Sequence, residues 1–207
     1  MMRNEILDGT LQPGERLKIV EIAARFGISP IPVREAMRLL AGEGLIEMIA
    51  HRGAVVREVD RDFIIDVFDI RAALEGMLAE RAVERLRPGQ LKIIAQAADG
   101  YVKAAGQGEL RVMMDQNNAF HREIYLVGNN PDAMRMVDNG WALVRALRLR
   151  IGMAQDRVAR NIEQHGAIVA ALEARDRVAI AAAVRVHCIS GRDDLLASFD
   201  AEIAHGG

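Results

Sequence analysis

Three histidines in this chain have the residue type and the spacing to do chemistry together. His121, His165 and His187 each lie among apolar residues at helical spacing, so each is expected on a buried helix face. One histidine on an apolar face is more often a core residue than a ligand. Three of them form a binding site only if the helices that carry them bring their side chains to one place.

The spacing of the last two histidines indicates that they meet. If helices over 157–174 and 177–203 form an antiparallel hairpin, residues equally distant from the turn lie side by side. The mean of 165 and 187 is 176, and Asp176 lies in the predicted turn. We therefore expect His165 and His187 to be level with each other.

A further polar side chain is expected beside the first histidine. Asn117 and His121 are four residues apart, so they share one face of a helix. Asp115 is six residues from His121, which places it about 120° around the helix at roughly 100° per residue. The carboxylate of Asp115 is therefore not expected to join the group.

A second set of candidate functional residues is a pair of arginines near the N-terminus. A helix over Ser29–Ala41 would place Arg34 and Arg38 outside its apolar stripe, with both guanidinium groups exposed. The apolar stripe consists of Val33, Ala36, Met37 and Leu40. Ser29 is a favourable N-cap, and the free amides of a first helical turn bind phosphate. Such a helix has the groups needed to enter the major groove of DNA, although two arginines on a solvated face are also compatible with no function.

The surrounding elements favour the DNA-binding interpretation. A short amphipathic helix over Ile19–Phe26 ends at Gly27, which permits a left-handed stop. The arginine-bearing helix follows, and then two short β runs, Leu45–Ile49 and Ala54–Arg57. Helix, tight turn, helix and a small β-hairpin wing is the order of a winged helix-turn-helix.

From Asp60 onward the pattern is almost continuously helical. Helices are predicted near 60–86, 90–105, 109–127, 131–155, 157–174 and 177–203. Short breaks containing glycine, proline or charged residues separate them, so consecutive helices should be antiparallel neighbours. The sequence thus predicts a mainly α protein, with the winged helix-turn-helix followed by an all-α antiparallel helical bundle.

Composition limits the class of protein. Half of the 207 residues are apolar, 4% are aromatic and the net charge is −2, which is typical of a globular protein. No apolar run approaches the roughly 20 residues of a membrane span. The single cysteine, Cys188, excludes an internal disulfide, and no signal-peptide core is visible, so a cytoplasmic location is expected.

The first 58 residues resemble the GntR family of bacterial regulators. The resemblance is carried by Pro13–Leu17, Pro32–Met37, Gly44–Ile46 and Arg52–Val56. It implies that Arg34 contacts operator bases and that Gly53 lies at the wing tip near the minor groove. Pro30 and Ile31 stand where the family usually has an arginine and a small polar residue. The expected DNA-binding residues are Ser29, Ile31, Arg34, Arg38, Arg52 and Gly53.

The remainder, Asp60–Ala204, resembles the effector domain of the FadR-like (FCD) branch of that family. Asn117, Phe120-His121 and the two later histidines match residues that bind a divalent metal there. The resemblance implies a metal held by Asn117, His121, His165 and His187, and neutral imidazoles suit zinc or nickel. Asn117 replaces the commoner aspartate and so removes one negative charge.

The same resemblance implies a small organic acid as effector. A carboxylate favours a bidentate guanidinium partner, and Arg71 in the first bundle helix is our candidate. A salt bridge from Arg71 to Glu75 is an alternative role for that arginine.

We therefore predict a ligand-responsive DNA-binding transcription regulator and favour a repressor. Residues 1–58 should form the DNA-binding domain and residues 59–207 the effector-binding and dimerisation domain of a homodimer. Two alternatives remain open: a sensor of the same family that uses no metal, and a metal-dependent hydrolase. The second is disfavoured because the sequence offers no general base beside the histidines and no phosphate-binding loop.

Overall fold

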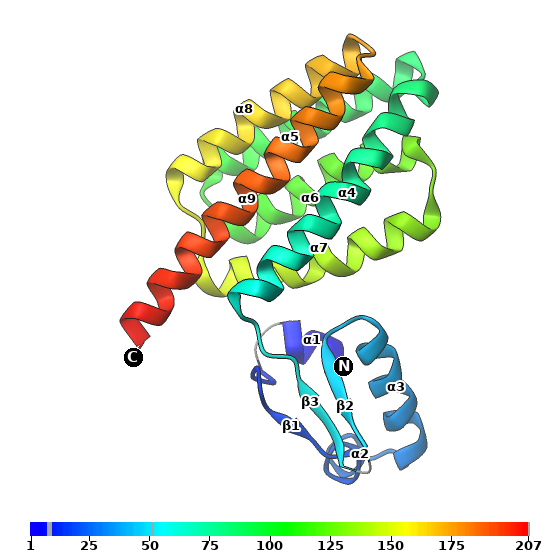
Figure 1. The fold of residues 1–207 in the computed structure, drawn as a ribbon, viewed down its shortest axis with the longest axis vertical. Helices are drawn as coiled ribbons and strands as arrows, with labels where there is room; N and C mark the ends of the chain where they lie inside the picture. The colour runs from blue at the N-terminus through cyan, green and yellow to red at the C-terminus, as the bar shows by residue number, and fades with distance from the viewer. Residues whose placement is uncertain (8–9, 51, 207) are drawn as a thin grey trace. The chain divides into compact units, whose positions relative to one another are not determined.

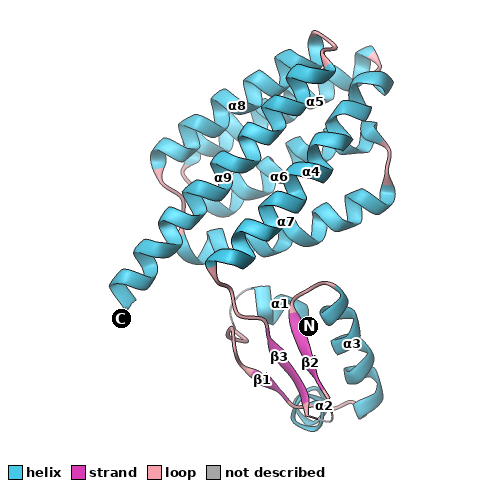
Figure 2. Cartoon of the chain, viewed as in Figure 1, coloured by secondary structure: helices cyan, strands magenta, loops and turns pink. Residues whose placement is uncertain are grey.

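The computed structural model of the chain describes residues 1–7, 10–50 and 52–206. The chain divides into two compact units, Met1–Asp60 and Arg61–Gly207. The first is small and mixed α/β, and the second is entirely helical in its described part (Figure 1; Figure 2).

In its described residues, the N-terminal unit contains three short helices and a small sheet. In chain order the elements are α1 (Met2–Leu7), β1 (Arg16–Leu17), α2 (Ile19–Phe26), α3 (Pro30–Gly42), β2 (Ile46–Ile49) and β3 (Gly53–Val56). The sheet is antiparallel with strand order β1-β3-β2, so the expected hairpin is joined by a third strand. β1 is only two residues long, too short for a recognisable alternation of apolar and polar residues.

Local sequence explains how α2 leads into α3. Gly27 adopts φ 66° and ψ 32°, the left-handed conformation that ends α2, as its residue type predicted. Ser29 has extended backbone angles at the N-cap of α3, and Pro30 occupies the first turn, where its missing amide does no harm. Val33, Met37 and Leu40 are buried, and α3 packs on α2 and β2. This packing leaves the opposite face of α3 exposed.

Over residues 61–206, the second unit is a bundle of six helices whose order agrees with the sequence prediction. They are α4 (Arg61–Arg85), α5 (Pro88–Gln107), α6 (Leu110–Gly128), α7 (Pro131–Ile151), α8 (Gln155–Glu173) and α9 (Arg177–Gly206). The largest difference concerns α7, which was expected to reach residue 155. It ends at Ile151 because Gly152 leaves the helical region, with φ 96° and ψ −171°.

α4 packs on three other helices of the bundle, α6, α7 and α9 (Figure 1). α6 comes very close to α4 at Gly128, where an added Cβ would lie 2.4 Å from the carbonyl oxygen of Leu78. α5 packs on α6 and α8, and α8 packs on α9. Among the described residues, no helix is long and apolar enough to cross a membrane.

The turn between α8 and α9 sets the register of that helix pair. Arg175 takes a positive φ of 53°, which reverses the chain. The Asp176 carboxylate accepts the amides of Val178 and Ala179 at 2.9 Å each and so caps the start of α9. The turn therefore centres on Asp176, as the level arrangement of His165 and His187 requires.

Candidate functional site

The exposed face of α3 carries the residues expected to read DNA. Ile31, Arg34 and Arg38 all lie on it, and Ile31 is 74% exposed. Arg38 donates to Glu35 at 3.1 Å, whereas Arg34 has no ion-pair partner among the described residues. Ser29 makes no side-chain cap hydrogen bond, so its hydroxyl is available to a phosphate. Pro30 and Pro32 have no N–H, so within the first turn of α3 the amides available are those of Ile31 and Val33.

The wing brings two further expected residues to the surface of the sheet. Arg52 is exposed, just before β3. Gly53 has φ 91°, and a Cβ on it would lie 2.2 Å from the carbonyl oxygen of Leu17 in β1. A glycine is therefore required here to let β3 pass close to β1, whatever the wing contacts.

Inside the bundle, three helices bring the three histidines together. His121 on α6, His165 on α8 and His187 on α9 each offer a ring nitrogen, and these three atoms lie within 4.8 Å of one another. All three side chains are buried. The Nε2 atoms of His121 and His187 are 3.0 Å apart.

Neighbouring hydrogen bonds determine where two of these rings carry their protons. Tyr125 donates its hydroxyl to the Glu75 carboxylate at 2.6 Å, so its oxygen accepts from His121 Nδ1 at 3.2 Å. His187 Nδ1 donates to the amide oxygen of Gln164 at 3.0 Å. Both Nε2 atoms are then unprotonated and direct lone pairs at each other. Two imidazole nitrogens bound to one first-row metal at 2.0–2.1 Å are separated by roughly 3.0–3.4 Å, which agrees with the spacing here.

His165, the third member of the triad, has a buried ring without hydrogen-bond partners among the described residues. Neither of its ring nitrogens has a hydrogen-bond partner within the described part of the chain, although both are buried. Buried polar atoms are rarely left without a partner, because burial removes their bonds to water. The donor set and this unsatisfied ring together fit a bound metal ion.

Burial also keeps the triad in its ligand form. Loss of solvation, together with the positive charges of Arg71 and Arg157, lowers the pKa of His121 to about 3. The pKa values of His165 and His187 are lowered well below their usual range, again mainly by burial. All three imidazoles are therefore neutral at neutral pH, the form that binds metals.

Asn117 lies one helical turn before His121 on α6 and is buried. It lines a cavity that borders His187. Asp115 points elsewhere, as its spacing predicted, because it is 57% exposed and pairs with Arg145 at 2.8 Å. The candidate ligands themselves are thus an amide and three imidazoles, all uncharged.

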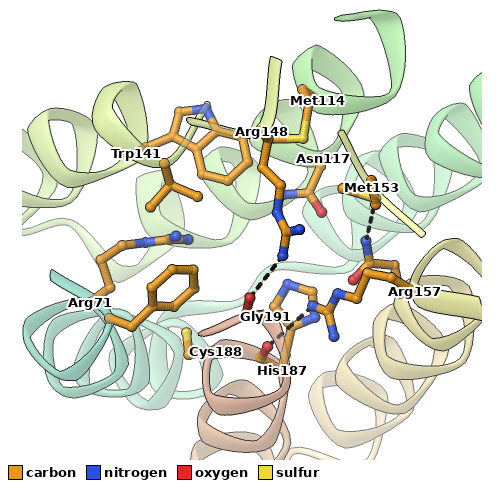
Figure 3. Close-up of a pocket in the computed structure, with 13 residues that line it drawn as sticks. Arg71, Met114, Asn117, Trp141, Arg148, Met153, Arg157, His187, Cys188 and Gly191 are labelled. Carbon is orange, nitrogen blue, oxygen red and sulfur yellow. Dashed lines mark hydrogen bonds between the residues drawn. The ribbon is translucent and has the colours of Figure 1, made fainter. Parts of the chain in front are cut away.

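The cavity beside the triad has a volume of about 30 Å³ and a strongly basic lining. Its lining residues are Phe68, Arg71, Met114, Asn117, Trp141, Val144, Arg148, Met153, Arg157, Asn161, His187, Cys188 and Gly191. Figure 3 shows the guanidinium groups of Arg71, Arg148 and Arg157 reaching toward this space from three different helices. The arrangement is suited to an anion.

Both roles considered for Arg71 are compatible with its position. Its Nε donates to Glu75 at 2.7 Å, and both side chains are buried. Its guanidinium also lies over the rings of Phe68 and Trp141, about 5 Å from each centroid, and borders the cavity.

Sequence reasoning missed Arg148, Arg157 and Asn161, all of them buried lining residues. One signal was available for two of them. Arg157, Asn161 and His165 are spaced by four, so they follow one face of α8.

Comparison with known proteins agrees with this geometry. The model of the family described as "Bacterial regulatory proteins, gntR family" matches residues 1–56, and the FCD domain model matches residues 66–190. A probable D-xylose utilization operon transcriptional repressor of Paenarthrobacter nicotinovorans is 33% identical over 83% of this chain and 75% of its own. The repressor GlaR of Escherichia coli is 25% identical over 91% of this chain and 90% of its own. The solved structure of E. coli McbR/YncC has a TM-score of 0.76 at 24% identity, covering 96% of this chain and 94% of that one.

A winged helix-turn-helix followed by a helical bundle with a buried basic cavity defines a DNA-binding transcription regulator. The chain belongs to the gntR family of bacterial regulatory proteins and carries an FCD domain. These families regulate transcription rather than catalyse reactions, so the hydrolase alternative has no support.

Proposed function

We propose that the helical bundle of this regulator is a metal-containing sensor of a small organic acid. The observation that carries the proposal is the 3.0 Å separation of the Nε2 atoms of His121 and His187, beside the unpartnered ring of His165. The hydrogen bonds of the two Nδ1 atoms lead us to infer that both Nε2 atoms are unprotonated. Two lone pairs at that distance repel unless a proton or a cation lies between them, and each ring already holds its proton on Nδ1.

The triad would hold the metal, with Asn117 as a weaker fourth ligand. Zinc or nickel is the ion we favour, because both bind neutral imidazole. A bound ion supplies a Lewis acid with open positions for oxygen atoms of a ligand. Around it, Glu75 and Gln164 keep two rings in the required tautomer through the hydrogen bonds described above.

A small carboxylate effector would enter the basic cavity, where Arg71 is one of the guanidinium groups available to it. We propose that its binding changes the equilibrium between arrangements of the bundle and so the affinity for DNA. The effect on affinity depends only on how differently the acid binds these arrangements.

On the DNA side, we propose that residues 1–58 contact the operator and that residues 59–207 bind the effector and pair two chains. A homodimer would place two α3 helices in successive major grooves. The contacts would come from Ser29, Ile31, Arg34, Arg38, Arg52 and Gly53. Repression is the favoured outcome, because two of the relatives compared above are named as repressors.

Metal content of untagged protein tests the sensor. We expect close to one zinc or nickel per chain, or uptake of one on titration at neutral pH. A His165→Ala variant should take up none yet still retard operator DNA in a gel. Absence of uptake by the wild-type protein would leave a regulator of this family that senses without a metal.

A further inference from the structure

Arg157 is a deeply buried cation whose partners are all neutral. Its side chain belongs to a residue only 3% exposed. It donates to the Ser190 hydroxyl at 2.5 Å, to the Gln164 amide oxygen at 3.4 Å and to the His187 carbonyl at 3.4 Å. Within the described residues, no aspartate or glutamate forms an ion pair with it.

The other two guanidinium groups of the cavity are compensated. Arg71 pairs with buried Glu75 at 2.7 Å, and Arg148 approaches Asp194, whose side chain is 7% exposed, at 2.7 Å. Arg157 therefore differs from its neighbours in having no carboxylate at ion-pair distance. Asp194 acts on it only from farther away, and that carboxylate already pairs with Arg148 and Arg160. Burial, together with the positive charge of Arg148, lowers the pKa of Arg157 to about 10 even though the negative charge of Asp194 opposes the shift, so the protein holds this charge at a cost.

The unpaired charge lies next to the triad rather than at the far end of the cavity. Arg157 extends along α8 to Gln164, seven residues later, and the same amide oxygen accepts from His187 Nδ1. The triad itself contributes no negative charge, and Asn117 contributes none either. An anion at this point would meet Arg157 and any cation held by the histidines together.

Asn161 supplies a second unsatisfied group between Arg157 and His165 on α8. Its Nδ2 donates to the Tyr101 hydroxyl at 2.8 Å and lies 3.9 Å from Met153 Sδ. Its Oδ1 is buried and has no partner among the residues that the structure describes. Because Asn161 lines the cavity, a ligand that donates a hydrogen bond would satisfy this oxygen.

We propose that Arg157 and Asn161 select the effector, and that the effector is a short hydroxy acid. Its carboxylate pairs with Arg157, and its hydroxyl donates to Asn161 Oδ1. An ammonium group could also donate, but it would add a positive charge beside three guanidinium groups. This assignment rests on the proposed sensor function, since it names the acid that the sensor binds.

The small cavity favours an acid of a few carbon atoms. A volume of about 30 Å³ holds about two water molecules, so a ligand must displace water and move at least one side chain. Met153 is suited to give way, because it follows α7 outside the helices and has a flexible thioether side chain.

One test requires neither metal nor ligand. In chelator-treated protein, Arg157→Gln removes the buried charge that has no carboxylate at ion-pair distance, and keeps a hydrogen-bonding side chain. We expect its Tm to be higher than that of wild type by about 2–4 °C. Exposed Arg185 offers the matched control, and Arg185→Gln should leave Tm unchanged. A lower Tm for Arg157→Gln would mean that Arg157 serves the fold, and would overturn the assignment.

The second test measures selectivity in metal-loaded protein by titration calorimetry. The affinity for glycolate and lactate should exceed the affinity for acetate and propionate, which lack the hydroxyl, by about tenfold or more. Asn161→Leu should abolish that preference. Arg157→Gln should lower the affinity for the hydroxy acids by about tenfold or more. The assignment fails if hydroxy and plain acids bind alike, or if Arg157→Gln keeps wild-type affinity and preference. Wild-type protein that takes up metal but none of the four acids also overturns it, whereas protein that takes up no metal contradicts the sensor proposal itself.

Discussion

Glu75 is the residue whose replacement should disturb the bundle most. It is fully buried on α4 and accepts three hydrogen bonds, from Arg71 at 2.7 Å, from Tyr125 at 2.6 Å and from the Cys188 thiol at 3.4 Å. Through Tyr125 it also fixes the tautomer of His121. One carboxylate thus compensates a buried guanidinium and orients a candidate metal ligand.

The size of the effect follows from the charge left behind. Removing one partner of a buried ion pair costs about 3–5 kcal/mol, because the remaining charge is neither solvated nor compensated. In Glu75→Gln that charge is the Arg71 guanidinium. Loss of an outer hydrogen-bond partner also lowers metal affinity about 10–100-fold. Glu84 on the same helix provides the control, since it is 47% exposed and pairs with Arg177, and its loss should cost under about 1 kcal/mol.

Urea denaturation of chelator-treated Glu75→Gln and Glu84→Gln, with metal titrations of the same proteins, measures both effects. We expect only the Glu75 variant to lose several kcal/mol and to bind metal weakly. Equal stability of the two variants would refute the account of Glu75 as the charge partner of Arg71. Unchanged metal affinity in Glu75→Gln would refute its role behind His121.

Three further predictions concern the DNA-reading helix, the fourth ligand and pH. Arg34→Ala should weaken specific operator binding, measured by fluorescence anisotropy, by about 1–3 kcal/mol and leave effector binding unchanged. Wild-type affinity of this variant would show that Arg34 does not contact the operator bases. Asn117→Asp should tighten zinc binding in competition titrations by adding an anionic oxygen, and weaker binding would place this residue outside the metal's reach. Because the folded-state pKa of His121 is lowered to about 3, the unfolded chain takes up the proton first, and stability falls as pH drops below about 6.5. At pH 5 this one group should cost chelator-treated protein about 2 kcal/mol, and a free energy of unfolding that is flat from pH 7 to 5 would contradict it.

The helices and the meeting of the histidines were predictable because both follow from local rules. Helical spacing and glycine or proline breaks define the bundle helices, and a tight turn at Asp176 makes His165 and His187 level. The early end of α7 was not predictable, because the angles of Gly152 depend on how the loop joins α8. The two-residue strand β1 is formed only by pairing with β3, so no pattern within it could reveal it.

The basic cavity was the most important feature that the sequence analysis did not predict. A helical pattern shows that Arg148 and Arg157 occur near apolar positions, but an arginine can also extend its stem over apolar surface and keep its charge in water. Whether the guanidinium turns inward depends on which other helices enclose it. Glu75 is similar, because its role behind Tyr125 and His121 comes from residues 46 and 50 positions away in the sequence.

The central claim is that His121, His165 and His187 together hold one metal ion. Crystals of the full-length protein loaded with zinc or nickel, measured at the absorption edge of that metal, test it most directly. We predict one anomalous difference peak per chain, within about 2.0–2.3 Å of a nitrogen of each histidine. A peak located elsewhere, or no peak between the three rings at full metal loading, would contradict the claim.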